Sequence, residues 1–244
     1  TITRTVAEQA FQILKKNGLQ YKVATLTAKE KICFCEKAEC NPDVCPYAKG
    51  HFDRVNDAVY EMITTMEEMS RENIETQAKK HSVCPFEMGL DVSLWVDAII
   101  CDYNYVFDPN AHLKRFFSEG KKGEYLFLID EAHNLVERGR EMYSAVLYKE
   151  EFLQMKKAVR YESVKLTRQL EGCNQMLLEM KRECQTYKEY NSISHFALKL
   201  LNVMNGLQKL LEEKEQVDEE VLEFYFHVRN FLNIYEEVDE NYVI

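Results

Sequence analysis

The sequence predicts an α/β part followed by an all-α part, with helices dominating overall. Strand-like segments alternate with helical segments up to about residue 145, which is typical of a parallel sheet covered by helices. After Tyr148 the apolar residues follow a helical period, and no segment has the composition of a strand. Gly (8) and Pro (4) are scarce among 244 residues, as expected of an ordered, helix-rich chain.

In the α/β part, each element is predicted from a local pattern. Apolar residues at helical spacing predict a helix over 5–17, and Gly18 is a suitable C-cap. The β-branched and aromatic content of YKVATLT predicts a strand over 21–27, and the polar stretch 30–50 is loop-like. A Met-rich helix is expected over 51–71 and a short helix over 85–96.

Two further strands are expected in this part. DAIICDYNYVFDP predicts a buried strand over 97–109 that stops at a proline, and a helix over 111–117 follows it. EYLFLID predicts a strand over 124–130, and its nearly unbroken apolar run implies burial on both faces, as in a parallel sheet. Between them, SEGKKGEY (118–125) is expected to form a charged, hairpin-like turn.

The all-α part predicts three antiparallel helices, near 149–185, 193–214 and 218–238. Lys and Arg outnumber Asp and Glu between residues 149 and 209, and the reverse holds between 212 and 240. The net charge of −10 argues against a protein whose whole surface binds nucleic acid. Because charge is segregated along the chain, a basic face remains possible, and so does the simpler reading of solvated helix faces.

No apolar run is long enough to span a bilayer, and the first residues have no signal-peptide pattern. We therefore expect a cytoplasmic protein without membrane contact.

The segment FLIDEAH (127–133) places two carboxylates at the carboxyl end of the expected strand, where open α/β sheets bind ligands. Asp130 suits a Mg²⁺ ligand, Glu131 suits the group that orients an attacking water, and His133 is placed to sense a γ-phosphate. The simpler alternative is that two acids begin a helix at its positive end. No GxxxxGK[ST] loop is present in these residues.

Of the eight cysteines, four lie within thirteen residues (Cys33, Cys35, Cys40 and Cys45), and in an intracellular protein such crowding favours a metal site over disulfides. Cys33, Cys40, Cys45 and Cys84 are separated by six, four and 38 residues, and both Cys45 and Cys84 precede a proline. Four thiolates bind either Zn²⁺ or an iron–sulfur cluster. The wide first gap and the distant last cysteine disfavour zinc without excluding it. Cys35 is a fifth thiol, as well spaced from Cys40 as Cys33 is.

Taken together, these motifs resemble the iron–sulfur DNA helicases of superfamily 2, the group of the xeroderma pigmentosum group D helicase and bacterial DinG. The resemblance covers roughly residues 1–145 and is greatest to bacterial members of the DEAD_2 type. It rests on five segments in order: ITRTVAEQA (2–10), TAKEKIC (27–33), ECNPDVCPYAKGHFDRVNDA (39–58), CPFEMGLDVSLWVDAIICDYNYVFDP (84–109) and LFLIDEAHNLVERGRE (126–141).

The resemblance implies an ATP-dependent 5′→3′ DNA helicase with a 4Fe–4S cluster held by Cys33, Cys40, Cys45 and Cys84. It gives Asp130, Glu131 and His133 the Walker B roles of a DEAH box. It implies that Arg4 and Thr5 contact the DNA backbone, and that Lys29, the basic residue four positions before the first cysteine, also contacts DNA. Tyr103 and Tyr105 either line the path of the single strand or pack in the core of the strand on which they alternate.

In this resemblance, residues 1–29 and 97–145 are parts of the first motor domain, 30–96 the cluster domain and 146–244 the helical Arch domain. The Walker A loop and the second motor domain lack counterparts here, so we expect a fragment of a prokaryotic helicase that does not hydrolyse ATP alone. Mg²⁺ and ATP then belong to the full-length parent. The expected partners are single-stranded or forked DNA and the rest of the helicase chain, with a monomeric state. The alternatives are a non-enzymatic module that binds zinc through four cysteines and docks a protein, and an iron–sulfur electron carrier.

Overall fold

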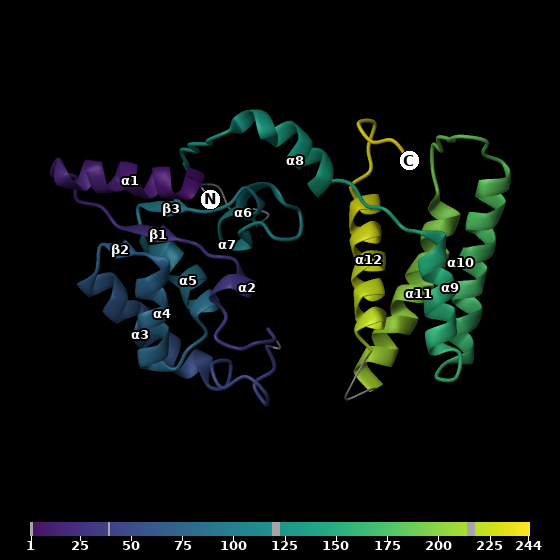
Figure 1. Ribbon diagram of the computed structural model, residues 1–244, viewed down its shortest axis with the longest axis horizontal. Helices are drawn as coiled ribbons and strands as arrows, with labels where there is room; N and C mark the ends of the chain where they lie inside the picture. The colour runs from purple at the N-terminus through teal and green to yellow at the C-terminus, as the bar shows by residue number, and fades with distance from the viewer. Residues whose placement is uncertain (1, 39, 119–122, 214–217) are drawn as a thin grey trace. The chain divides into compact units, whose positions relative to one another are not determined.

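The computed structural model describes residues 2–38, 40–118, 123–213 and 218–244 (Figure 1). The chain divides into two compact units, residues 1–133 and 134–244. The second unit begins earlier than the expected Arch boundary at 146, and the division into four domains stays a prediction. None of the helices in the described ranges is both long and apolar enough to span a bilayer.

The first unit is built on a parallel sheet with the strand order β2–β1–β3. Strand β1 (Val23–Thr25) pairs with β2 (Glu68–Met69) on one side and with β3 (Ala98–Ile100) on the other. Val23 is in register with both Glu68 and Ala98. All three residues of β1 are buried, so both faces of the central strand are covered, as a parallel sheet requires.

Helices cover both faces of this sheet (Figure 1). Helix α1 (Ile2–Lys16) lies along one face, and Gly18, with φ of 89°, ends it as the sequence predicts. Helices α3 (His51–Thr65), α4 (Arg71–His81) and α5 (Pro85–Val92) pack together on the other face. Their shared core contains fully buried apolar side chains: Ala24, Ala58, Met62, Met69, Ala78, Val83, Met88 and Val92. The 3₁₀ turn η1 (Ser93–Trp95) follows α5.

The predicted helix over 51–71 ends early, at Thr65, and the sequence prediction missed β2 and α4 after it. Two tertiary features explain the break. Met69 is fully buried in an extended conformation, and the hydroxyl of Ser70 caps α4 by accepting a hydrogen bond from the Asn73 amide at 3.3 Å. A two-residue strand has too little pattern to be found from sequence.

The predicted strand over 97–109 is only three residues long in the structure. After β3 the chain forms α6 (Asn104–Phe107), so Tyr103 and Tyr105 do not alternate on a strand. The Asp108 carboxylate then accepts hydrogen bonds from the amides of Asn110 and Ala111, which turns the chain toward α7 (Lys114–Phe117). Residues 119–122 of the expected charged turn lie outside the described residues.

The predicted strand over 124–130 is absent: within 123–129 no residue is assigned to a strand. Leu126 and Leu128 are 87% and 86% exposed, whereas Tyr125 and Phe127 contact Phe117 with ring centroids 5.7 and 6.2 Å apart. The run is therefore exposed, with its two aromatic rings against Phe117. It is not a strand because none of the described strands pairs with it, and a strand exists only with a partner.

The second unit is a bundle of helices. Helix α8 (Leu135–Met142) precedes α9 (Lys149–Val159), α10 (Val164–Arg182), α11 (Ser194–Glu213) and α12 (Glu219–Glu236), and α9 contacts both α10 and α12. The predicted helix over 149–185 is two helices, because Ser163 caps α10 by accepting a hydrogen bond from the Leu166 amide at 3.2 Å. The other two predicted helices are confirmed within a few residues of their predicted ends.

Candidate metal centre and acidic motif

The five cysteines of the candidate metal centre come from three adjoining segments of the first unit. Cys33 is the C-cap of the short helix α2 (Lys29–Ile32), and Cys84 is the N-cap of α5. Cys35, Cys40 and Cys45 lie on the loop 33–50, where Cys45 is buried and Cys40 is exposed. Helix α2 contacts α5, which brings the first and the last cysteine segments to the same end of the unit.

Three of these thiols form one group. The sulfur atoms of Cys35 and Cys45 are 3.7 Å apart. The pKa of Cys35 is raised to about 11, chiefly by its hydrogen bond with Cys45, then by burial and by the neighbouring Cys33. Cys35, the thiol that the family resemblance leaves out of the ligand set, is thus in direct contact with a predicted ligand.

The other two thiols gather around Lys29. The pKa of Lys29 is raised, first by a hydrogen bond with Cys40 and further by the charges of Cys84 and Glu87. Burial is the main cause of the raised pKa of Cys84, and Glu87 and Cys40 add to it. Lys29, predicted as a basic residue near the first cysteine, therefore lies beside the second and the fourth.

In the part of the chain that the structure describes, no three His, Cys, Asp or Glu side chains form a group able to hold a metal ion. The donor chemistry nevertheless fits an iron–sulfur cluster, because thiolates are its usual ligands and all five thiols are free. The two sets of thiols lie at the same end of one unit, but in the described residues they do not form a single set of metal ligands.

Polar contacts hold the segments of the last two cysteines together without any metal. The Arg54 guanidinium donates to the carbonyl of His81 at 3.0 Å, to that of Ser82 at 2.6 Å and to that of Lys49 at 2.7 Å. The Cys84 amide donates to Nδ1 of His51 at 3.2 Å. His51 is buried, which lowers its pKa and favours the neutral ring that this hydrogen bond needs.

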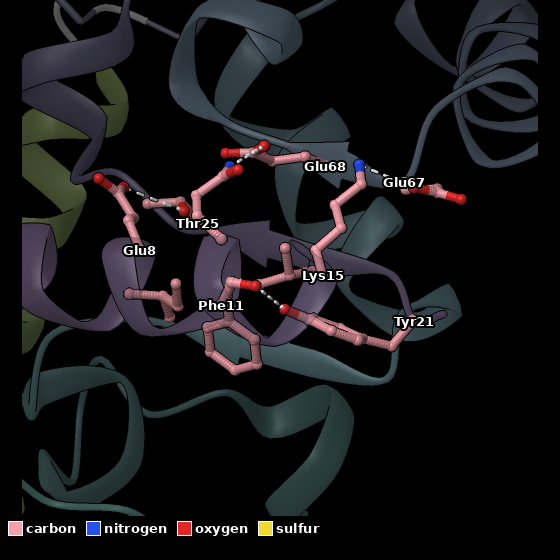
Figure 2. Close-up of a pocket in the computed structure, with 10 residues that line it drawn as sticks. Glu8, Phe11, Lys15, Tyr21, Thr25, Glu67 and Glu68 are labelled. Atoms are coloured by element: carbon pink, nitrogen blue, oxygen red, sulfur yellow. Dashed lines mark hydrogen bonds and ion pairs between the residues drawn. The ribbon is translucent and has the colours of Figure 1, made fainter. Parts of the chain in front are cut away.

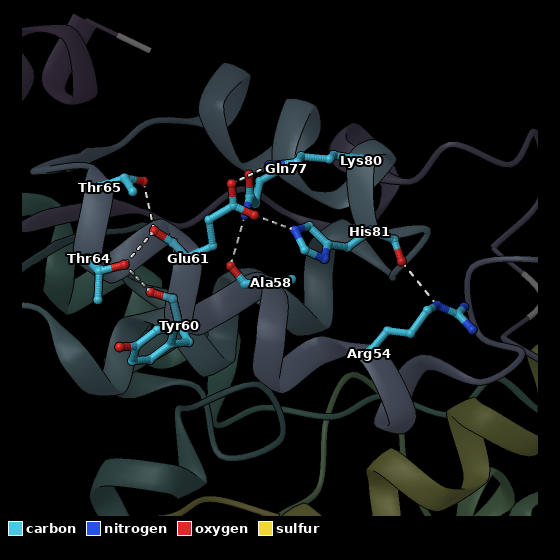
Figure 3. A network of polar contacts seen from close by, with 9 residues as sticks. All are labelled: Arg54, Ala58, Tyr60, Glu61, Thr64, Thr65, Gln77, Lys80 and His81. Carbon is cyan, nitrogen blue, oxygen red and sulfur yellow. Dashed lines mark hydrogen bonds and ion pairs between the residues drawn. The ribbon is translucent and has the colours of Figure 1, made fainter.

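A second polar network joins α3 to α4 (Figure 3). The Glu61 carboxylate binds Lys80, accepts from Gln77 at 3.2 Å, and is 2.7 Å from Nε2 of His81. These contacts lower the pKa of Glu61 to about 2, with Lys80 the largest cause. Figure 3 shows Arg54 and Glu61 holding the same helix end from two sides, one at the backbone and the other at the side chains.

A shallow hollow lies between α1 and the sheet (Figure 2). Lys15 pairs with Glu67 at 2.7 Å, Gln12 donates to Glu68 at 2.6 Å, and the Tyr21 hydroxyl donates to the Phe11 carbonyl at 2.6 Å. Its free space is about 10 Å³, enough for about one water. These contacts therefore fasten α1 to the sheet rather than surround a ligand.

The acidic motif is exposed and does not emerge from a strand. Its backbone is held by Tyr103, whose hydroxyl donates to the Asp130 carbonyl. Glu131 has φ of 51°, and its amide donates to the Asp130 carboxylate at 2.9 Å. His133, in the 3₁₀ turn η2 (Ala132–Asn134), places Nδ1 3.3 Å from the Glu131 carboxylate. Expecting these acids at a strand end was wrong, because residues 123–129 pair with no described strand.

The predicted DNA contacts are dispersed over the first unit. Thr5 lies on α1 and is exposed, whereas the side chain of Arg4 lies outside what the structure describes. Tyr105 is half-buried and donates to the Thr27 carbonyl at 3.4 Å, just beyond β1. Tyr103 and Tyr105 thus hold backbone carbonyls in this structure. Their role toward DNA stays a prediction.

Comparison with known families matches residues 9–152 to the family described as DEAD_2. The matched residues include all five cysteines of the candidate metal centre and the acidic motif. The chain belongs to the DEAD_2 family.

Among curated relatives, this DEAD_2 chain is 24% identical over 144 residues to a regulator of telomere elongation helicase 1 homolog of Oryza sativa subsp. japonica. It is 32% identical over 73 residues to a Fanconi anemia group J protein homolog of Gallus gallus. These alignments cover 54% and 30% of this chain, but only 14% and 6% of the relatives.

Among solved structures, the chain is similar to one titled "Truncated XPD", with a TM-score of 0.51 and 15% sequence identity. That likeness covers 98% of this chain and 67% of the other. The DEAD_2 match ends within α9, so for α10 to α12 the likeness is one of fold alone.

Proposed function

We propose that this DEAD_2 chain is part of an ATP-dependent DNA helicase that acts in the cytoplasm and moves 5′→3′ along single-stranded DNA. The names of the telomere-elongation helicase homologs support the activity. The chain spans 16% or less of those relatives, so ATP hydrolysis and strand separation are assigned to a longer parent protein.

The cysteine segments are proposed to hold a 4Fe–4S cluster through Cys33, Cys40, Cys45 and Cys84. When bound, the cluster supplies a covalent cross-link between the loop 33–50 and the start of α5, and such links contribute folding free energy. Cys35 lies against Cys45 and remains a spare thiol in this assignment. Lys29, beside Cys40, neutralises part of the negative charge of the thiolates.

The acidic motif is proposed to complete an ATP site of the parent protein. Asp130 would hold Mg²⁺, Glu131 would orient the attacking water, and His133 would report on the γ-phosphate through its contact with Glu131. Without a phosphate-binding loop in these residues, this chain alone should not turn over ATP.

Single-stranded or forked DNA is the proposed partner. Arg4, Thr5 and Lys29 are the proposed phosphate contacts, and Tyr103 and Tyr105 the proposed stacking contacts. The helices α9 to α12 would serve as the Arch domain that frames the strand, in a monomeric parent.

The observation that carries this proposal is the gathering of five thiols at one end of the first unit, in a chain of the DEAD_2 family. The test is purification under argon, followed by absorption spectroscopy and measurement of iron, acid-labile sulfide and zinc. We expect a brown protein with broad absorption near ~400 nm and about four irons per chain. A colourless protein with about one zinc per chain would contradict the cluster and favour a zinc module.

A further inference from the structure

Two side chains on the first turn of α3, those of Arg54 and His51, join the segments of the last two cysteines. Arg54 lies on the first turn of α3, just after the loop that carries Cys45. Its guanidinium reaches Lys49, four residues after Cys45, and Ser82, two residues before Cys84. Arg54 and Ser82 are 28 positions apart along the chain, so this hydrogen bond is a tertiary contact.

We propose that Arg54, assisted by His51, is a positioning residue that fixes the Cys45 and Cys84 segments relative to each other before a metal cluster binds. This inference rests on the proposed iron–sulfur function. It assigns the two residues no contact with the cluster itself.

The geometry suits this task because the guanidinium group is planar and presents several donors in a rigid fork. Three carbonyls that end α4 or precede α3 accept from it at 2.6 to 3.0 Å. A lysine has a single ammonium on a flexible stem and cannot reproduce this fork. His51 adds a direct contact, since its Nδ1 accepts the Cys84 amide and thereby sets the direction of the α5 N-terminus.

Two positions with positive φ, Gly50 and Ser82, leave room for the Arg54 side chain. Gly50 and Ser82 have φ of 66° and 53°, so both segments turn sharply beside the guanidinium. A Cβ atom on Gly50 would lie 2.6 Å from Nη1 of Arg54, closer than side-chain atoms approach. A side chain at residue 50 would therefore strain the turn and displace Arg54 as well.

The test compares Arg54→Lys, Arg54→Met and Gly50→Ala with the wild type in two measurements. The first is amide hydrogen exchange of the metal-free protein over residues 45–50 and 82–84. The second is the rate at which the cluster-loaded protein loses iron to a chelator. Supporting residues around metal ligands typically change metal retention roughly 10- to 100-fold. We expect faster exchange in both segments and roughly tenfold faster iron loss, with Lys milder than Met.

Glu61→Gln is the matched control, because Glu61 joins the same two helices through the side chains of Gln77, Lys80 and His81 and not through the backbone carbonyls that Arg54 binds. It should lower the stability of the unit and leave iron loss at the wild-type rate. If the Arg54 variants exchange at wild-type rates, or if they exchange faster yet keep iron as the wild type does, the positioning role is wrong. The same holds if Glu61→Gln loses iron as fast as they do.

Failure of the proposed function would look different. The wild type itself would then be purified without iron, while the exchange of residues 82–84 in the metal-free protein would still report whether Arg54 holds them. If residues 82–84 are protected from hydrogen exchange by Arg54 but the protein never binds iron, Arg54 does not position these residues for a cluster.

Discussion

The loop that carries the cysteines and the bundle of the second unit are stabilised in opposite ways. In the bundle, Phe152, Leu170, Leu200, Val203 and Leu207 are fully buried among other apolar side chains. In the loop, Cys45 is the one buried side chain among described residues 33–38 and 40–50. The loop is held by a hydrogen bond from Arg54 to the Lys49 carbonyl and by an edge-to-face contact between its own Phe34 and Tyr47 rings, whose centroids are 4.8 Å apart.

This difference indicates which region depends on a bound group. A fully buried apolar side chain stabilises a fold by about 1.5–3 kcal/mol, whereas a typical hydrogen bond contributes about 0.5–1.5 kcal/mol net. The bundle therefore has enough apolar burial to fold on its own contacts. The loop is held by a few polar contacts. A cluster that links its cysteines to Cys84 would supply the stabilising free energy that the loop lacks from apolar burial.

The largest effect is expected from removing a proposed ligand. Cys40→Ser should lose the iron entirely and accelerate hydrogen exchange across residues 30–90, because the loop loses its cross-link. Exchange within α9 to α12 should not change. Cys184→Ser, just beyond α10, is the control and should keep its iron. If Cys40→Ser keeps full iron while Cys35→Ser loses it, the ligand assignment is wrong by one residue.

A core truncation tests the other side of the comparison. Leu200→Ala removes a fully buried side chain from α11 and should cost about 2–5 kcal/mol of unfolding free energy. Urea denaturation followed by circular dichroism measures it. Leu198→Ala, on the same helix but 62% exposed, should change stability by less than about 0.5 kcal/mol. Equal effects of the two variants would show that α11 does not pack as described.

Helix caps should matter about equally in the two regions, since capping is local. Ser163→Ala removes the cap of α10 and Ser70→Ala that of α4, and each should cost about 1 kcal/mol. Thermal unfolding measures both, with Ser144→Ala as a control at an exposed position that caps no helix. A negligible effect of Ser163→Ala would show that this hydrogen bond does not stabilise the start of α10.

The smallest effect is expected from pH and should appear only in the first unit. The pKa of Glu61 is about 2 in the folded protein, below its ordinary value of 4.5. Folding is therefore favoured by its charged form above about pH 4.5, and this contribution is lost as pH falls toward 2. In metal-free protein, the urea midpoint of the wild type should exceed that of Glu61→Gln at pH 6 and approach it near pH 2. A difference that is constant with pH would contradict the network in Figure 3.

Local patterns in the sequence predicted most of the helices. Gly18 marked the end of α1, and the apolar periods marked α3, α5, α11 and α12. The missed elements were those whose signal is short or depends on distant partners. Strand β2 has two residues, and the break before α10 depends on one serine.

The candidate site was predictable in composition but not in arrangement. Cysteine spacing indicated a metal site, the family resemblance selected Cys33, Cys40, Cys45 and Cys84 as its ligands, and their role stays a prediction. The spacing could not indicate that Cys35 contacts Cys45 or that Lys29 lies by Cys40. The contacts of Arg54 and His51 were not predicted, because nothing in the sequence around a basic residue on the first turn of a helix indicates which distant backbone groups it binds.

The sequence alone determined the class of the molecule: where most of the longer helices lie, where the thiols are concentrated, and which family motifs are present. Those properties follow from local backbone preference and from residue chemistry. The tertiary structure alone decided which segments pair, as the unpaired run 123–129 and the Arg54 contacts illustrate. Strand pairing and side-chain contacts require partners that are distant in the sequence. The local sequence of a segment does not show whether such a partner strand or carbonyl lies beside it in the fold.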